Sequence, residues 1–173
     1  MNSYRTHTCG QLRKEDAGKQ VKLAGWIHRK RNLGSLCFVD LRDHYGITQC
    51  VVDSDSDLFA KIQALRAESV IGIDGEVVIR ENINKNMPTG DVEIKVSGIE
   101  VYSEADVLPI QVAVEDDAPE ELRLKYRFLD LRKERIHKNI ILRSQVIAEM
   151  RRLMVEQGFT EYQTPILTAS SPE

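Results

Sequence analysis

The first half of the chain alternates between apolar and polar side chains, a pattern typical of half-buried β-strands. From this alternation we predict five strands, at residues 21–29, 36–41, 47–52, 70–79 and 91–101. The residues from Asp43 to Gly46 favour a turn and predict a hairpin between the second and third strands. In the fifth strand the apolar positions change phase at Gly98, which predicts a β-bulge.

A short helix is predicted between the third and fourth strands. Leu58, Ile62 and Leu65 fall on one helical face, and Ser56 or Asp57 can cap the first turn. Five strands with a single helix in this position is the order of an OB-fold, a small Greek-key barrel that binds single-stranded nucleic acids or oligosaccharides across its second and third strands. The first part is therefore predicted to be mainly β, but the fold alone does not assign a function.

Beyond the barrel the periodicity becomes helical. An acidic run at 115–121 marks the change, and Pro119 suits a first helical turn. A longer helix is predicted over 135–157, with Gly158 as its left-handed stop, and 159–163 then predicts a strand. The apolar stripe of the long helix consists of Ile136, Ile140, Ile147, Met150 and Met154.

The length of 173 residues allows one hydrophobic core and part of a second. We expect an OB-fold domain over residues 1–108 and a helical hinge over 109–134. Residues 135–173 would then be the first helix and strand of an α+β domain that is incomplete here, because one helix and one strand cannot cover both faces of a sheet.

Charge excludes one simple mode of nucleic-acid binding. With 42% hydrophobic and 29% charged residues, the chain has the composition of an ordinary globular protein. The formal net charge of −3 excludes a uniformly basic surface that would hold nucleic acid by charge alone. Any such binding must be local, and basic residues do gather at 28–31 and 122–143. Each cluster taken alone is most simply a solvated face.

The remaining composition argues for a cytosolic protein without a metal site. No apolar run is long enough to span a bilayer, and the amino terminus lacks the apolar core of a signal peptide. The cysteines are odd in number and widely spaced, so we expect reduced thiols. The histidines lack the spacing of a structural zinc site. The cysteines are Cys9, Cys37 and Cys50, and the histidines are His7, His28, His44 and His137.

Four residues on the first three strands could together bind unpaired bases. Phe38 is predicted to lie on the outer face of the second strand, where its ring can stack on a base, although a core position is the simpler interpretation for a lone phenylalanine. Gln49 offers an amide that can both donate and accept, and Arg29 and Arg31 can contact phosphate or a base edge. On one barrel face they would combine charge, a stacking plane and a hydrogen-bonding edge, as recognition of single-stranded RNA requires.

The sequence has no phosphate-binding loop of the GxxxxGK[ST] or GxGxxG kind and no defensible catalytic triad. We therefore expect no reaction to be catalysed by this stretch alone.

Longer strings in the sequence resemble bacterial-type aspartyl-tRNA synthetases. The strings are GWIHRKRNLGSLCFVDLRDHYGITQCVVD at 25–53, NMPTGDVEI at 86–94, ADVLPI at 105–110, LRLKYRFLDLR at 122–132 and GFTEYQTPILTASSPE at 158–173. Together they extend over nearly the whole chain. The resemblance implies an amino-terminal OB-fold that binds the tRNA anticodon, a hinge, and a class II antiparallel catalytic domain.

The resemblance also implies roles for individual barrel residues. Phe38 would stack on an anticodon base, while Gln49, Arg31, Asn82 and Glu93 would read base edges or place the RNA backbone. The partner would be the tRNA for aspartate. Whether the asparagine tRNA is also a substrate is left open, because that choice depends on loop detail.

For the end of the chain, the resemblance implies the first of three class II motifs, a helix and strand that end at Pro165 and form a homodimer interface. Glu173 would help to bind the aspartate substrate. The full-length family member would be an ATP-dependent aspartate–tRNA ligase that uses ATP and Mg²⁺. Most of the residues that hold these ligands would lie outside this stretch, so we expect the chain to be inactive alone.

Two other functions remain open on the residues themselves. One is a stand-alone OB-fold RNA-binding or regulatory protein derived from a synthetase. The other is a protein-interaction module whose outer barrel face meets a partner.

Overall fold

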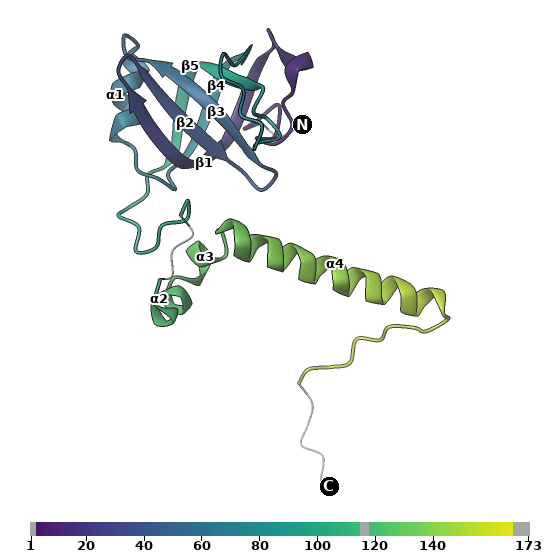
Figure 1. Cartoon of the computed structure of the whole chain (residues 1–173). Coiled ribbons are helices and arrows are strands. Elements are labelled where there is room, and N and C mark those ends of the chain that lie inside the picture. Colours follow the sequence, from purple (N-terminus) through teal and green to yellow (C-terminus); the bar gives the residue numbers. More distant parts are fainter. Residues whose placement is uncertain (1–2, 115–117, 168–173) are drawn as a thin grey trace.

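A computed structural model describes residues 3–114 and 118–167 and shows a closed five-stranded barrel followed by helices (Figure 1). The spatial order is β1-β2-β3-β5-β4, with β4 pairing back onto β1. All neighbours are antiparallel except β3 and β5. The strands are β1 (Gln20–Leu33), β2 (Leu36–Arg42), β3 (Ile47–Asp53), β4 (Val70–Ile79) and β5 (Val92–Ser103); the helix α1 (Asp57–Ala64) lies between β3 and β4, and a short 3₁₀ turn, η1 (Lys14–Asp16), precedes β1. The predicted OB-fold is confirmed.

The barrel interior is filled by the apolar positions of the predicted alternation. Burying these side chains supplies the main stabilisation of the fold, because it removes apolar surface from water. The three cysteines are free and buried, and burial raises the pKa of each thiol, so they lie in the structure as neutral groups. The largest fully buried side chains in the barrel are Leu12, Leu23, Ile27, Val39, Leu41, Val52, Ile62, Ile71, Ile73, Val77 and Ile94.

The barrel has three register shifts, one between β1 and β2 and two between β4 and β5, and two of them bear on the predicted strand faces. The predicted bulge in β5 is confirmed, because Asp74 pairs with Gly98 while the next residue, Gly75, pairs with Val96. A second bulge in β1 was not predicted: Ile27 pairs with Leu41, Arg29 pairs with Asp40, and His28 is the extra residue. An extra residue reverses the inward and outward alternation of a strand. Without the bulge, Arg31 would lie on the same face of β1 as buried Ile27, because the two residues are an even number of positions apart. With the bulge, Arg31 is exposed.

Helix α1 begins as predicted, with the Ser56 hydroxyl accepting a hydrogen bond from the backbone N–H of Leu58 at 3.2 Å. At the other end of α1, Lys30 donates its ammonium group to backbone carbonyls, including that of Gln63 at 2.9 Å. A cation is favourable at this negative end of a helix. Lys30 is thus occupied in joining β1 to α1.

The chain after β5 forms a linker and three helices, α2 (Glu120–Lys125), α3 (Arg127–Asp130) and α4 (Glu134–Glu156). The predicted long helix is confirmed as α4, which projects away from the barrel and leaves most of its apolar stripe exposed (Figure 1). None of the helices in the described ranges is long and apolar enough to cross a bilayer. A small second core joins linker to helices and contains Ile110, Val112 and Leu129.

Two predictions for this region are wrong. Pro119 stands at the N-cap of α2 and so precedes the first helical turn. Residues 159–163 do not form a strand, because within the described part of the chain no neighbouring strand pairs with their backbone. Residues 115–117, which include part of the predicted acidic boundary, lie outside the described residues.

Acid is expected to loosen the α2–α3 region through Asp130. This buried carboxylate accepts hydrogen bonds from Arg123 and Arg127 at 3.0 and 2.8 Å, and the bond from Arg123 lowers its pKa. Because the folded pKa lies below the unfolded value of about 3.9, the stabilisation is present above that value and is lost as the pH falls through the folded pKa. Hydrogen exchange of the α2 and α3 amides, corrected for intrinsic rates, should show lower protection near pH 3 than at pH 7.

An Asp130→Asn variant should already show the low protection at pH 7, whereas exposed Glu121→Gln should match the wild type. Equal protection of Asp130→Asn and wild type at pH 7 would contradict this role of Asp130.

Candidate nucleic-acid interface

Phe38 and Arg31 lie together on the outer surface of the barrel. They are directly paired across β1 and β2, and the guanidinium carbon of Arg31 is 6.0 Å from the centre of the Phe38 ring. Phe38 is half-buried, whereas Cys37 and Val39 on either side are fully buried and face the core. The core position considered for Phe38 is therefore excluded, and the cation of Arg31 lies near the Phe38 ring.

Gln49, on β3, is the centre of a hydrogen-bond network. Its Oε1 accepts from Arg31 at 3.0 Å and from Arg80 at 3.1 Å, and its Nε2 donates to Glu93 at 2.7 Å. The residue is only 4% exposed. Both acceptor sites of Oε1 are thus used within the protein. The sequence predicted an amide available to a base, but the structure shows one that first fixes the side chains around it.

Arg80 is a member of this network that the sequence analysis missed. It directly follows β4, where its backbone N–H donates to the carbonyl of Asp91 at 3.0 Å. Its Nε lies 3.8 Å from Glu93, and its Nη1 is buried without a hydrogen-bond partner among the described residues. The position of Arg80 in the sequence could have indicated this role. An arginine at the end of the fourth strand reaches the same barrel edge as Glu93 at the start of the fifth.

The carboxylates balance the arginines of this surface. Glu93 faces outward between buried Val92 and Ile94. Asp40, paired with Gln49 across β2 and β3, lies 3.2 Å from Arg31. We call the set Arg31, Phe38, Asp40, Gln49, Arg80 and Glu93 the outer-face cluster.

Arg31 is the cluster cation that a ligand can reach. Its side chain is 53% exposed, and an exposed ion pair such as the one with Asp40 contributes little free energy. A phosphate or base edge can therefore replace Asp40 as the partner of Arg31 at low cost. The cluster offers a stacking plane, an exposed cation and a fixed amide within one small surface, which suits unpaired nucleotides.

Four predicted site residues lie outside the outer-face cluster. Arg29 donates a hydrogen bond to the backbone carbonyl of Ala113 and so binds the linker. Asn82 is exposed in the β4–β5 loop, two residues after Arg80. Pro165 is exposed in the segment after α4, and Glu173 lies outside the described residues.

Two family models match consecutive parts of the chain. Residues 21–102 match the OB-fold nucleic acid binding domain, and residues 119–173 match tRNA synthetases class II (D, K and N). The first range contains the whole outer-face cluster, and the second contains α2, α3 and α4.

Curated relatives match over the full length of the chain. It is 61% identical over 175 residues to an aspartate–tRNA(Asp/Asn) ligase of Paramagnetospirillum magneticum and 60% identical to one of Zymomonas mobilis, covering 20% and 29% of those proteins. The crystal structure of asparaginyl-tRNA synthetase from Pyrococcus horikoshii superposes with a TM-score of 0.83 at 30% identity, over 94% of this chain and 38% of that one. The chain thus spans a fifth to less than a third of the length of these two curated relatives.

The barrel followed by these helices, with both family models in that order, corresponds to the amino-terminal portion of a class II aminoacyl-tRNA synthetase. Within that class the chain belongs to the aspartate–tRNA ligase family and corresponds to its amino-terminal portion. The predicted family is confirmed.

Proposed function

We propose that the outer-face cluster binds the anticodon loop of tRNA. The observation that carries the proposal is the Phe38 ring beside the Arg31 guanidinium, which is itself hydrogen-bonded to the fixed amide of Gln49. Phe38 would stack on one anticodon base, and Arg31 would contact a phosphate or a base edge. Gln49 and Glu93 would read base edges, and Asn82 would contact the loop from the β4–β5 side.

In this proposal the chain supplies RNA recognition to an aspartate–tRNA ligase. The full-length enzyme would activate aspartate with ATP and Mg²⁺ and then transfer the aspartyl group to the terminal ribose of tRNA. Binding at the barrel places the acceptor end and supplies selectivity without bond chemistry. Glu173 would help to bind aspartate, and we expect the chain alone to bind RNA without charging it.

We further propose the division into an anticodon-binding domain over 1–108, a hinge over 109–134 and the start of the catalytic domain over 135–173. The exposed stripe of α4 and Pro165 would form part of a homodimer interface. An apolar stripe of this size favours burial against a second surface.

The curated relatives are named for both the aspartate and the asparagine tRNA. We propose the same dual recognition here. The two anticodons, GUC and GUU, share their first two bases and differ in the third, so the cluster would read the shared bases and tolerate either pyrimidine.

Binding of labelled anticodon stem-loops tests the proposal. Loops with GUC and GUU should bind with similar affinity, and a loop with GCC on the same stem should bind about tenfold more weakly, because one base contact is lost. Equal binding of all three loops would leave only non-specific RNA affinity. No RNA affinity at moderate salt would instead favour the protein-interaction module.

A further inference from the structure

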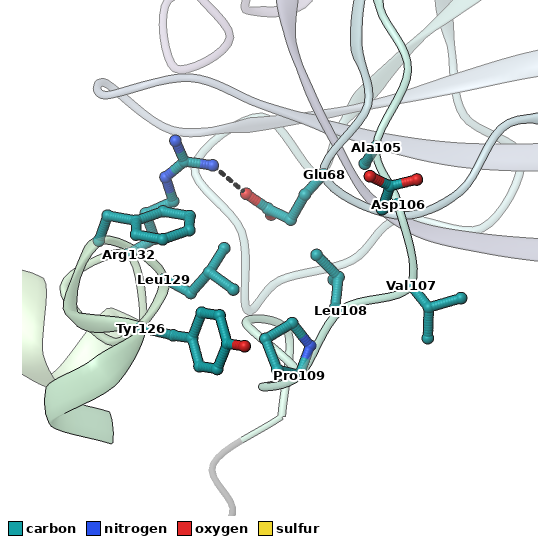
Figure 2. A pocket seen from close by; sticks show the side chains of 10 residues that line it. Glu68, Ala105, Asp106, Val107, Leu108, Pro109, Tyr126, Leu129 and Arg132 are labelled. Carbon is teal, nitrogen blue, oxygen red and sulfur yellow. Dashed lines mark hydrogen bonds and ion pairs between the residues drawn. The ribbon is translucent and has the colours of Figure 1, made fainter. Parts of the chain in front are cut away.

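The helical region contacts the barrel at Arg132 and at His137 of α4, whose Nε2 lies 3.3 Å from Nδ1 of His44 in the β2–β3 turn. Arg132 follows α3, and its Nη1 donates to the carboxylate of Glu68 at 2.8 Å (Figure 2). The guanidinium carbon of Arg132 also lies 4.9 Å from the centre of the Trp26 ring. Trp26 belongs to β1 and Glu68 to the turn before β4, so one side chain joins the helices to two parts of the barrel.

Contacts within the barrel hold Glu68 and Trp26 in place independently of Arg132. The Glu68 side chain is 3% exposed and also binds Arg42 at 2.7 Å. Arg42 is in turn fixed by the His28 ring at 2.7 Å, and burial and Arg42 lower the pKa of His28, so that its ring is neutral at pH 7. Arg42 lies on Trp26 as well, at 5.8 Å from the ring centre, so Trp26 contacts both arginines.

The backbone of Glu68 is strained in a way that serves the contact. Its φ is +67°, the one positive value among the described residues other than glycine. Such a conformation is unfavourable for a residue with a side chain and persists only where surrounding contacts hold it. Here the Glu68 N–H donates to the carbonyl of Ile27 at 2.8 Å, which ties the turn to β1 and aims the carboxylate at both arginines.

Apolar packing does not fill the rest of this junction. A cavity of about 440 Å³ lies between the linker and α3. Figure 2 shows Leu108 and Pro109 of the linker on one side of it and Tyr126 and Leu129 on the other. Domains joined by a small or incomplete apolar interface move relative to one another unless specific contacts prevent it. Polar contacts are therefore left to set the orientation, chiefly the part-buried one at Arg132, since the His44–His137 contact is exposed to water.

We propose that Trp26, Glu68 and Arg132 form a joint that holds the barrel at a fixed orientation to α3 and α4. A planar guanidinium suits this purpose because it can bond a carboxylate and stack on an aromatic ring at once. These are positioning residues. Their consequence for tRNA rests on the proposed function: the joint would set the direction from the anticodon site to the class II region. The joint itself does not depend on RNA binding.

Distances between two spin labels in the 173-residue chain test the joint. Labels at Glu76→Cys on β4 and Asn139→Cys on α4 occupy exposed positions, and the three native cysteines are buried. The unmodified joint should give one narrow distance distribution. Arg132→Gln should roughly double its width, and Arg132→Lys, which keeps the charge but lacks the planar group, should give an intermediate width. Arg143→Gln, on the exposed surface of α4, is the matched control and should change nothing.

Trp26 is the single tryptophan and gives a second measurement. Its emission should move to longer wavelength in Arg132→Gln and remain unchanged in Arg143→Gln. Glu68→Gln breaks the same contact from the barrel side, so the double variant with Arg132→Gln should be no wider than the wider single variant. An unchanged distance distribution in Arg132→Gln, or additive widening in the double variant, would overturn the joint.

Stem-loop binding separates this proposal from the proposed function. Arg132→Gln should bind the GUC stem-loop as the wild type does, because Arg132 is not in the outer-face cluster. If the wild-type chain does not bind stem-loops, the proposal of anticodon recognition is overturned. The distance measurement still tests the joint, because the joint does not depend on RNA binding.

Discussion

Replacing Phe38 by alanine is expected to weaken binding of the GUC stem-loop by about 1–3 kcal/mol, or roughly 5- to 150-fold in Kd. Any unpaired base, whatever its identity, can stack on an aromatic ring. Phe38 is the aromatic member of the outer-face cluster. The loss should be similar for the GUC and GUU loops, because stacking tolerates different bases. Fluorescence anisotropy at fixed salt measures both affinities.

The fold should survive this change, since Phe38 lies outside the buried core. A thermal melt of Phe38→Ala should therefore remain close to that of the wild type. Tyr45→Ala is the matched control: it removes an exposed aromatic ring from the turn at the far end of the same hairpin and should leave RNA affinity unchanged. If Phe38→Ala binds both loops as tightly as the wild type, Phe38 does not contact RNA.

The barrel could be predicted from the sequence because the patterns that define its strands, bulge and helix cap each lie within a few neighbouring residues. In β4, Ile71, Ile73 and Val77 fall on the buried face that the two-residue period assigns to them, and the predicted range 70–79 is the observed one. The bulge at Gly98 was visible for the same reason, since the apolar phase changes within a few residues. Ser56 could be chosen as a cap because its position relative to Leu58 is also a local property.

What escaped prediction depends on contacts between distant residues. The β1 bulge at His28 is defined by pairing with β2, and no change of phase marks it because the residues after Ile27 are basic. Arg80 belongs to the site only because the closed barrel brings the end of β4 to Gln49 on β3. The predicted strand at 159–163 failed for a related reason, since a strand needs a partner as well as a suitable sequence.

The structure also changes the interpretation of Gln49. A surface amide that samples several orientations would lose freedom on binding RNA, whereas this one is already held by Arg31, Arg80 and Glu93. Preorganisation of this kind reduces the entropic cost of binding. Gln49 therefore has two roles in the proposal, one in ordering the cluster and one in contacting a base, and a substitution should affect both.

Gln49→Met is expected to lower the free energy of unfolding by about 2–3 kcal/mol, because it leaves buried polar and charged groups without their partner. Methionine matches the length of glutamine, so the change removes hydrogen bonds with little change in volume. Glu93 loses its 2.7 Å bond, and Arg80, whose Nη1 already has no partner among the described residues, loses its bond from Nη2. Urea unfolding measures the difference.

The matched control is Gln63→Met, the same substitution at an exposed position on α1, which should leave the free energy of unfolding unchanged. Below the unfolding transition, Gln49→Met should also bind the GUC stem-loop more weakly than the wild type, because Arg31 and Glu93 are no longer held in place. A variant that is destabilised but keeps full affinity would limit Gln49 to a structural role. Because Gln49 is only 4% exposed, little water can replace its hydrogen bonds when they are removed. A Gln49→Met variant as stable as Gln63→Met would therefore show that these bonds do not stabilise the barrel.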